Sequence, residues 1–310
     1  MEKKTKIFIT GGNGMVGRNL QENLNNIKEF EVNAPRREVL DLLDYESTVN
    51  YINKYKPDII IHCAGMVAGI QKNIEKPFSF LSVNTIMGFN LLNASIQNRI
   101  EKVINLGSSC MYPKNKSTEL KEEDILTGEL EPTNEGYAIS KIAVAKLCQY
   151  AFKEYSLSYK TIIPCNLYGK YDSFDENTSH MIPAAIRKIH YANKKGKKPV
   201  IWGDGTARRE FMFVEDLVDF IVFSILNYEK LESITNVGLG YDYSVLEYYR
   251  AISEVIGYDG PFDKDLSKPR GMEKKLCCIK KQTELGWSPR HTLQQGLLKT
   301  YNYYLEKHEL

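Results

Sequence analysis

The chain has 310 residues, of which 43% are hydrophobic and 26% are charged. These are the proportions of an ordinary globular protein, long enough for one large α/β unit or for two domains that share a core. Its 41 basic and 39 acidic side chains give a net charge of +2, so no global field marks a nucleic-acid binder. The first strand is too short for a signal peptide or a membrane span, and we expect a cytoplasmic protein with no membrane partner.

The spacing of the cysteines and histidines matches neither a disulfide framework nor a metal-binding motif. Six cysteines and five histidines are spread along the chain without a CxxC motif or a Cys/His cluster. This distribution argues against disulfide bonds and against a metal site.

A strand, a glycine-rich turn and a helix follow one another at the start of the chain. Lys6–Thr10 is a buried-strand pattern, and an amphipathic helix runs to about Leu24. Between them, Gly11 permits a tight turn, Gly14 lets the backbone approach a pyrophosphate, and Gly17 lets the helix pack on the strand. This order predicts a dinucleotide site, against the alternative of a plain glycine loop.

Two arginines follow the next predicted strand, near residues 30–34. NAD sites usually carry a carboxylate there for the ribose hydroxyls, whereas a 2′-phosphate calls for arginine. Arg36 and Arg37 therefore favour NADP(H), with a solvated turn as the alternative.

The middle of the first half continues the alternation of helix and strand. Residues 48–55 read as a helix, and 58–65 form a continuous apolar run that ends on Ala64 and Gly65, beside which a cofactor could pass. The helix predicted over 82–95 has a wider apolar surface than one stripe. It is either enclosed in the core or also meets another subunit.

Three residues farther along have the chemistry of a proton relay to a carbonyl. Ser108 follows the apolar run 103–106 and should lie at the end of a strand. Tyr137 and Lys141 are four residues apart on a predicted helix that runs to about 155, so they share a face. We expect the ammonium to lower the pKa of the phenol from about 10 toward neutrality. A chance pair on a solvated helix is the alternative.

The second half is less regular. We expect a strand over 158–169, a polar loop over 170–179 and a helix from about 182, and then further short elements. These further elements are strands at 200–203, 209–214 and 234–238, and helices at 214–226, 244–256 and 293–305. The fold class predicted is α/β, with a doubly wound, mostly parallel Rossmann sheet and a smaller C-terminal α/β substrate domain. The cofactor domain would cover 1–168 and about 210–238, and the substrate domain 169–209 and 239–310.

Nearly the whole chain resembles the extended short-chain dehydrogenase/reductases, and among them the GDP-L-fucose synthases. The motifs that carry the resemblance are Thr10-Gly-Gly-Asn-Gly-Met-Val-Gly17, Gly107-Ser-Ser-Cys-Met-Tyr-Pro113, Leu130-Glu-Pro-Thr-Asn-Glu-Gly-Tyr-Ala-Ile-Ser-Lys141, Asn166-Leu-Tyr-Gly169, Ser179-His-Met-Ile-Pro183 and Trp202-Gly-Asp-Gly-Thr206 with Arg209-Glu-Phe211. Several spaced motifs in one order are far more specific than any one of them.

The resemblance implies two sets of catalytic residues. Ser108, Tyr137 and Lys141 would serve the reductase step, in which Tyr137 protonates the C4 oxygen while NADPH delivers hydride to C4. Cys110 and His180 would form the acid/base pair that epimerises the carbons beside the ketone. Their alternatives are a small packing residue and a helix cap.

The resemblance also implies cofactor and substrate contacts and a homodimer built on the helices at 82–95 and 137–155. The cofactor contacts fall on Gly11, Gly14, Met15, Val16, Gly17, Arg36, Arg37, Leu42, Ala64, Leu106, Lys141, Pro164, Asn166, Leu167 and His180. The contacts to a GDP-sugar fall on Ser109, Asn166, Lys188, Trp202, Arg209 and Arg270.

The chain departs from the family pattern near its C-terminus. Arg270 and Cys278 stand where the family usually has two aspartates, which alters what is bound nearby. A reductase acting only at C4 of a related sugar, such as a GDP-6-deoxyheptose, is therefore the main alternative. A 4,6-dehydratase would need an Asp-Glu pair where Ser109-Cys110 stands, and a non-enzymatic NADP sensor would have little reason to keep all three relay residues.

Overall fold

The computed structural model describes residues 3–114, 116, 118–176, 178–267 and 272–308. Its centre is a six-stranded parallel sheet in the order β10-β5-β4-β3-β1-β2. The strands are β1 (Thr5–Thr10), β2 (Phe30–Asn33), β3 (Ile59–His62), β4 (Lys102–Leu106), β5 (Lys160–Pro164) and β10 (Ile234–Val237). The strand order reverses between β1 and β3, and the crevice at such a switch point is where ligands of these sheets bind.

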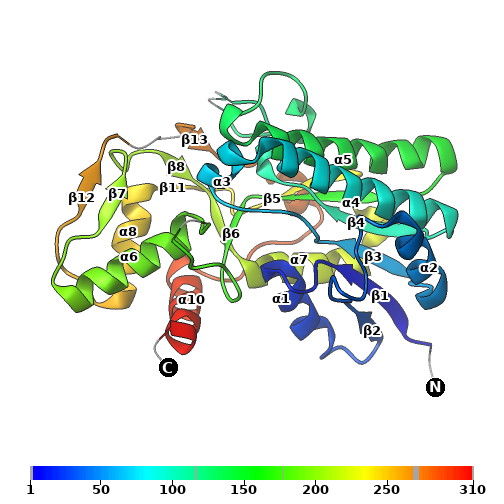
Figure 1. The fold of residues 1–310 in the computed structure, drawn as a ribbon, viewed down its shortest axis with the longest axis horizontal. Coiled ribbons are helices and arrows are strands. Elements are labelled where there is room, and N and C mark those ends of the chain that lie inside the picture. The colour runs from blue at the N-terminus through cyan, green and yellow to red at the C-terminus, as the bar shows by residue number, and fades with distance from the viewer. Residues whose placement is uncertain (1–2, 115, 117, 177, 268–271, 309–310) are drawn as a thin grey trace.

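Helices cover both faces of this sheet, which explains why its strands read as continuous apolar runs (Figure 1). One face carries α1 (Met15–Leu24) and α7 (Val214–Leu226), and the other carries α2 (Tyr45–Tyr55), α4 (Pro77–Gln97) and α5 (Glu135–Tyr155). Gly88 on α4 allows close packing on α5, since a Cβ atom there would lie 2.3 Å from Val144. The predicted doubly wound α/β fold is confirmed.

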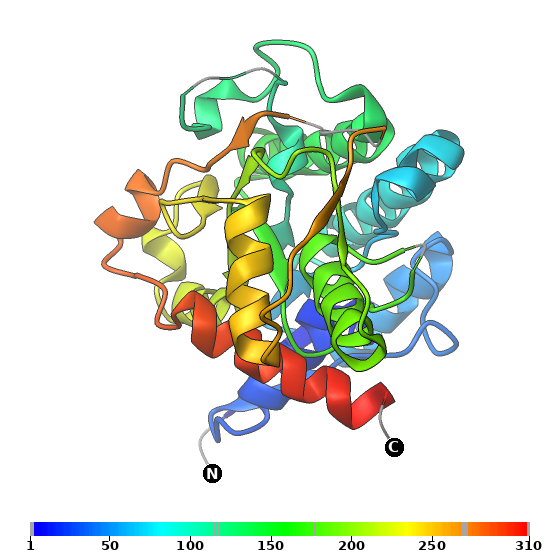
Figure 2. The ribbon, with the colours of Figure 1, turned by 90° about the vertical axis from the view of Figure 1, so that its left-hand side faces the viewer.

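A smaller half, built from short sheets and three helices, lies beside the large sheet (Figures 1 and 2). Its helices are α6 (Met181–Lys195), α8 (Val245–Ile256) and α10 (Leu293–His308). The short strands pair as β7 (Val200–Trp202) with β12 (Asp263–Asp265), β8 (Arg208–Arg209) with β11 (Tyr243–Ser244) and β13 (Lys274–Lys275), and β6 (Asn166–Tyr168) with β9 (Phe211–Phe213). Two short helices complete the chain, α3 (Ile70–Glu75) and α9 (Lys280–Glu284).

Part of the C-terminal third packs on the large half. Cys277 and Trp287 are buried in the core on the α1 and α7 side of the sheet, and Gln282 on α9 hydrogen-bonds the backbone of Gly238. Part of the segment that the prediction assigns to the substrate domain therefore contributes to the core of the large half, which is a change in packing along this segment. Apolar side chains that pack on the sheet determine that change, and the composition of the segment does not show it.

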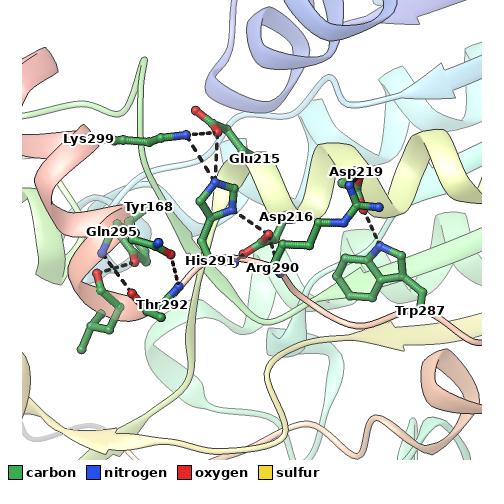
Figure 3. A network of polar contacts seen from close by, with 11 residues as sticks. Tyr168, Glu215, Asp216, Asp219, Trp287, Arg290, His291, Thr292, Gln295 and Lys299 are labelled. Carbon is green, nitrogen blue, oxygen red and sulfur yellow. Dashed lines mark hydrogen bonds and ion pairs between the residues drawn. The ribbon is translucent and has the colours of Figure 1, made fainter.

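A polar network fixes the start of α10 to α7 (Figure 3). Asp216, 1% exposed, accepts hydrogen bonds from the backbone of Arg290 at 3.0 Å and from the ring Nδ1 of His291 at 2.9 Å. Lys299 on α10 pairs with Glu215 at 2.6 Å. The smaller half is thus joined to the large one by buried polar contacts as well as by chain continuity.

Candidate active site

The glycine turn after β1 is packed tightly against the chain that follows β3 and against itself. Gly11 has φ +70°, and a Cβ atom there would lie 2.6 Å from the backbone nitrogen of Ala64. At Gly17 a Cβ atom would lie 2.3 Å from the carbonyl oxygen of Gly11. The N–H of Gly14 closes the turn on the same carbonyl at 3.0 Å, and α1 begins at the next residue. Only glycine at these two positions lets the turn close this tightly, and the turn and the start of α1 form a glycine cradle of the kind that binds a pyrophosphate.

A cavity beside this turn brings together residues from four parts of the sequence. It is lined by Phe8, Thr10, Gly11, Gly12, Asn13, Pro35, Arg37, Leu40, Asp41, Leu42, Leu43, Ala64, Val83 and Met87. Arg37 lines it and Arg36 does not, and Arg37 pairs with Asp41 at 3.1 Å. Asp41 is a carboxylate at this end of the cavity that the sequence patterns did not single out.

The relay residues meet where β4 ends and α5 begins. Ser108 caps a 3₁₀ turn over Ser109–Met111, and its Oγ accepts from the N–H of Cys110 at 3.3 Å. Tyr137 lies in the first turn of α5, and the Nζ of Lys141 lies 5.8 Å from the centre of its ring. Lys141, 7% exposed, donates to the carbonyl of Leu106 at 2.9 Å. The predicted shared face of Tyr137 and Lys141 is therefore present.

The electrostatics of this pair differ from the prediction. Burial lowers the pKa of Lys141 to about 8. Burial also raises the pKa of Tyr137, a negative charge on Cys110 would add to that rise, and a hydrogen bond with Ser108 opposes it. The prediction that Lys141 lowers the pKa of Tyr137 toward neutrality is wrong for the protein without ligands. Sequence spacing shows which groups are near one another but not how far water is excluded from them.

Cys110 lies among hydrogen-bond donors. Its Sγ is 3.2 Å from the Nδ2 of Asn134 and 3.5 Å from the Nζ of Lys275. Asn134 directly precedes α5, whereas Lys275 lies on β13 in the last fifth of the chain.

His180 stands at the N-cap position of α6, and burial lowers its pKa. The segment just before it touches the strip of chain that follows β3. Gly69 donates its N–H to the carbonyl of Thr178 at 3.1 Å, while a Cβ atom at Gly65 would lie 3.7 Å from the Nζ of Lys141. The 65–69 strip thus links the loop that carries His180 to the relay.

The other expected cofactor positions follow the carboxyl ends of the strands. Met15 and Val16 begin α1, Leu106 ends β4, Pro164 ends β5, and Asn166 and Leu167 lie on β6. The Nδ2 of Asn166 donates to the carbonyl of Glu210 at 2.9 Å, which ties β6 to the chain beside β9.

Four of the expected sugar-nucleotide residues lie on the smaller half, namely Asn166, Lys188, Trp202 and Arg209. Ser109 lies within the 3₁₀ turn and is 3% exposed. The Nζ of Lys188 on α6 lies 4.9 Å from the centre of the Trp202 ring on β7, and that ring is 52% exposed. Burial lowers the pKa of Arg209 on β8, while Glu131 opposes this shift. Arg270 lies outside the described residues.

Glu210 is a buried carboxylate that the sequence patterns left without a role. It is 1% exposed and accepts backbone N–H groups of Leu239 at 2.6 Å, Gly240 at 3.0 Å and Cys277 at 2.9 Å. Burial raises its pKa to about 7. Its position in the Arg209-Glu210-Phe211 motif was the only signal in the sequence. Within the described ranges, no group of three or more His, Cys, Asp or Glu side chains could hold a metal ion.

A glycine cradle at the switch point of a parallel sheet, with serine, tyrosine and lysine beside it, defines the class of nicotinamide-dependent short-chain dehydrogenase/reductases. The chain belongs to the NAD dependent epimerase/dehydratase family, whose model matches residues 7–238.

Comparison with known proteins confirms the resemblance predicted from the motifs. The chain is 52% identical to a GDP-L-colitose synthase of Yersinia pseudotuberculosis, over 97% of this chain and 98% of the relative. It is 46% identical to a GDP-L-fucose synthase of Azorhizobium caulinodans, over 100% of this chain and 99% of the relative. Among solved structures it is similar to a GDP-mannoheptose C4 reductase from Campylobacter jejuni with NADP bound, with a TM-score of 0.88, 28% identity and coverage of 98% and 99% of the two chains.

Proposed function

We propose that the protein is an NADPH-dependent enzyme that epimerises C3 and C5 and reduces C4 of a GDP-linked 4-keto-6-deoxy sugar, in the manner of a GDP-L-fucose synthase. The observation that carries the proposal is the juxtaposition of two reactive sets. Ser108 of the relay and Cys110 belong to the same short turn, and Tyr137 lies in the first turn of α5, which packs against it. A single bound sugar could therefore meet both sets.

NADP(H) fits the cradle and cavity beside β1. Gly11, Gly14 and Gly17 would hold the pyrophosphate at the N-terminus of α1, and Arg37 would meet the 2′-phosphate by exchanging its contact with Asp41. Lys141 would hold the nicotinamide ribose. When bound, the cofactor supplies a hydride for C4 of the sugar.

Tyr137 would give its phenolic proton to the C4 oxygen. Burial raises the pKa of Tyr137, so the phenol carries the proton that this step transfers. Ser108 would hold the same oxygen through its hydroxyl. Lys141, charged below about pH 8, would stabilise the phenolate that remains.

Cys110 and His180 would exchange the protons at C3 and C5. A hydrogen on a carbon beside the ketone is acidic enough for a thiol and imidazole pair to remove and return. Arg209 would meet the phosphates of the GDP group, and Lys188 and Trp202 would hold its other end.

Two neighbouring functions have specific support. The similarity to a GDP-L-colitose synthase favours the same chemistry on a different deoxysugar. The similarity to a GDP-mannoheptose C4 reductase, with Arg270 and Cys278 in place of the family's aspartates, favours reduction at C4 alone.

The test is cofactor oxidation with purified protein and a panel of GDP-4-keto sugars. We expect oxidation of NADPH in preference to NADH, with GDP-4-keto-6-deoxymannose among the substrates. Turnover only with a heptose would support the C4 reductase, and no oxidation with any GDP-4-keto sugar would contradict the proposal.

We also propose a cytoplasmic homodimer assembled through α4 and α5. Ile86, Tyr150 and Phe152 are large apolar side chains that these helices leave exposed in the single chain. Burying them against a second copy would remove apolar surface from water. None of the helices in the described part of the chain is long and apolar enough to cross a membrane.

A further inference from the structure

A strand from the C-terminal region is held across the candidate active site. β13 runs parallel to β8, with Lys275 in register with Arg209. Directly after it, the carbonyl of Leu276 accepts the N–H of Leu120 at 2.8 Å, and the N–H of Cys277 donates to Glu210 at 2.9 Å. Lys275 is thereby fixed by β8 and Glu210 on one side and by Leu120 on the other.

This anchoring directs Lys275 at the sulfur of Cys110. The Nζ to Sγ distance is 3.5 Å, and the Nδ2 of Asn134 approaches the same sulfur at 3.2 Å. Asn134 turns its donor toward the sulfur although its Oδ1, in the described part of the molecule, is buried without a hydrogen-bond partner. Both groups present N–H hydrogens, so the sulfur acts as an acceptor, and an ammonium is a stronger donor toward a thiolate than toward a thiol.

We propose that Lys275 is a positioning residue that stabilises Cys110 as the thiolate, the form that accepts a proton from the sugar. This inference rests on the proposed function. In the step, the C–H bond beside the ketone breaks, its electron pair forms the enolate, and the proton forms the S–H bond of Cys110. The charge on the sulfur is then replaced by a charge on the substrate oxygen, close to Ser108 and Tyr137.

The other titratable groups around the pair are consistent with this assignment. A negative charge on Cys110 raises the pKa of Tyr137, so the phenol keeps its proton while Cys110 is a thiolate. Lys275 also faces Cys277, but burial raises the pKa of Cys277 well above its ordinary value. Because Cys277 stays neutral, it does not compete with Cys110 for the ammonium of Lys275.

The register of Lys275 beside Arg209 allows a competing role, because neighbouring side chains on adjacent strands can share one ligand. In that role Lys275 would bind only the phosphates of the GDP group. The two roles predict different results in the absence of substrate. Only thiolate stabilisation would then change the reactivity of the Cys110 sulfur.

The experiment is alkylation of Cys110 by iodoacetamide across a pH range, read by peptide mass spectrometry, in the wild type, Lys275→Met, Lys275→Arg and Lys274→Met. Iodoacetamide reacts with the thiolate. Below the pKa of the thiol, the thiolate fraction and with it the alkylation rate change about tenfold for each pH unit. We expect Lys275→Met to slow alkylation at neutral pH by about tenfold or more and to move its pH profile upward. Lys275→Arg should restore most of the rate. Lys274 lies on the same strand near Asp242 and serves as the matched control, with an unchanged rate.

An unchanged alkylation rate and pH profile in Lys275→Met, with a higher KM for the GDP-sugar, would overturn the inference and leave Lys275 a phosphate ligand. Failure of Lys275→Arg to restore the rate would also overturn it, because the charge would then not be the cause. Thermal unfolding of each variant checks that the fold is retained. Alkylation uses no sugar or cofactor, so its result is separate from that of the turnover assay, which tests the proposed function.

Discussion

The predicted role of Tyr137 can be tested specifically, because a mutation can remove its hydroxyl and keep its ring. The ring packs edge-on against Phe80, with 6.5 Å between centroids. Tyr137→Phe keeps this packing and removes the proton donor. We expect NADPH oxidation to fall by about 10²- to 10⁴-fold, the usual contribution of general acid catalysis, with unchanged thermal stability. Steady-state kinetics decide the matter, and a rate near that of the wild type would refute the assigned role.

Lys141 predicts a pH dependence. Its pKa is lowered by burial to about 8, so its ammonium is present below that pH and is lost as the pH rises above it. If the charge holds the cofactor ribose and the phenolate, kcat/KM for NADPH should decline by about tenfold per pH unit above this value.

Lys141→Arg is the control, because a guanidinium stays protonated throughout the range. The alkaline decline should disappear in this variant, even if its rate is lower overall. A decline that persists unchanged in Lys141→Arg would assign the titration to another group.

At the scale of residues, the sequence predicted which residues form the relay better than it predicted how far they are buried. Ser108, Tyr137 and Lys141 were found from spacing on predicted elements, and the structure brings them together as expected. The direction of the Tyr137 pKa shift was missed, because burial is a property of the whole fold. Lys275 was missed because it lies 165 residues from Cys110 along the chain, and no local pattern joins them.

The prediction at the scale of elements concerns the hydrogen bonds between helix α7 and the loop before α10. Asp216 accepts three hydrogen bonds from Arg290 and His291 while 1% exposed. Asp216→Ala leaves these part-buried donors without their acceptor, and we expect the free energy of unfolding to fall by about 2 to 4 kcal/mol. Urea denaturation measures the change.

Glu215→Gln on the same helix is the matched control. The side chain of Glu215 is 39% exposed, and ion pairs on the surface contribute about 0 to 1 kcal/mol. Equal losses in the two variants would mean that the buried contacts of Asp216 have no special part in joining α10 to α7.

Long elements were predicted well, and so were the short strands β7, β9 and β10, which lie within the strands expected over 200–203, 209–214 and 234–238. The helix expected over 214–226 is α7, and the strand expected over 103–106 differs from β4 by one residue. The helix expected over 82–95 is longer, since α4 begins at Pro77, a residue that suits a first helical turn. Strands β8, β11 and β13 have two residues each, too few to show any periodicity, and only tertiary pairing defines them.

The assembly prediction belongs to the whole molecule. We expect a homodimer at micromolar concentration in sedimentation velocity, and Ile86→Glu on α4 should dissociate it by placing a charge in the buried contact. Leu226→Glu is the control, because Leu226 is exposed on α7, on the opposite side of the sheet. A monomeric wild type would contradict the proposed assembly.

The central claim is that one site both epimerises and reduces its sugar. The most direct measurement is NMR of the product formed from GDP-4-keto-6-deoxymannose and NADPH in deuterated water. The account predicts deuterium at C3 and C5 of an L-configured product, with Cys110→Ser abolishing the label but not the binding of NADPH. A reduced product without deuterium at those carbons would contradict the account and identify a reductase that acts only at C4.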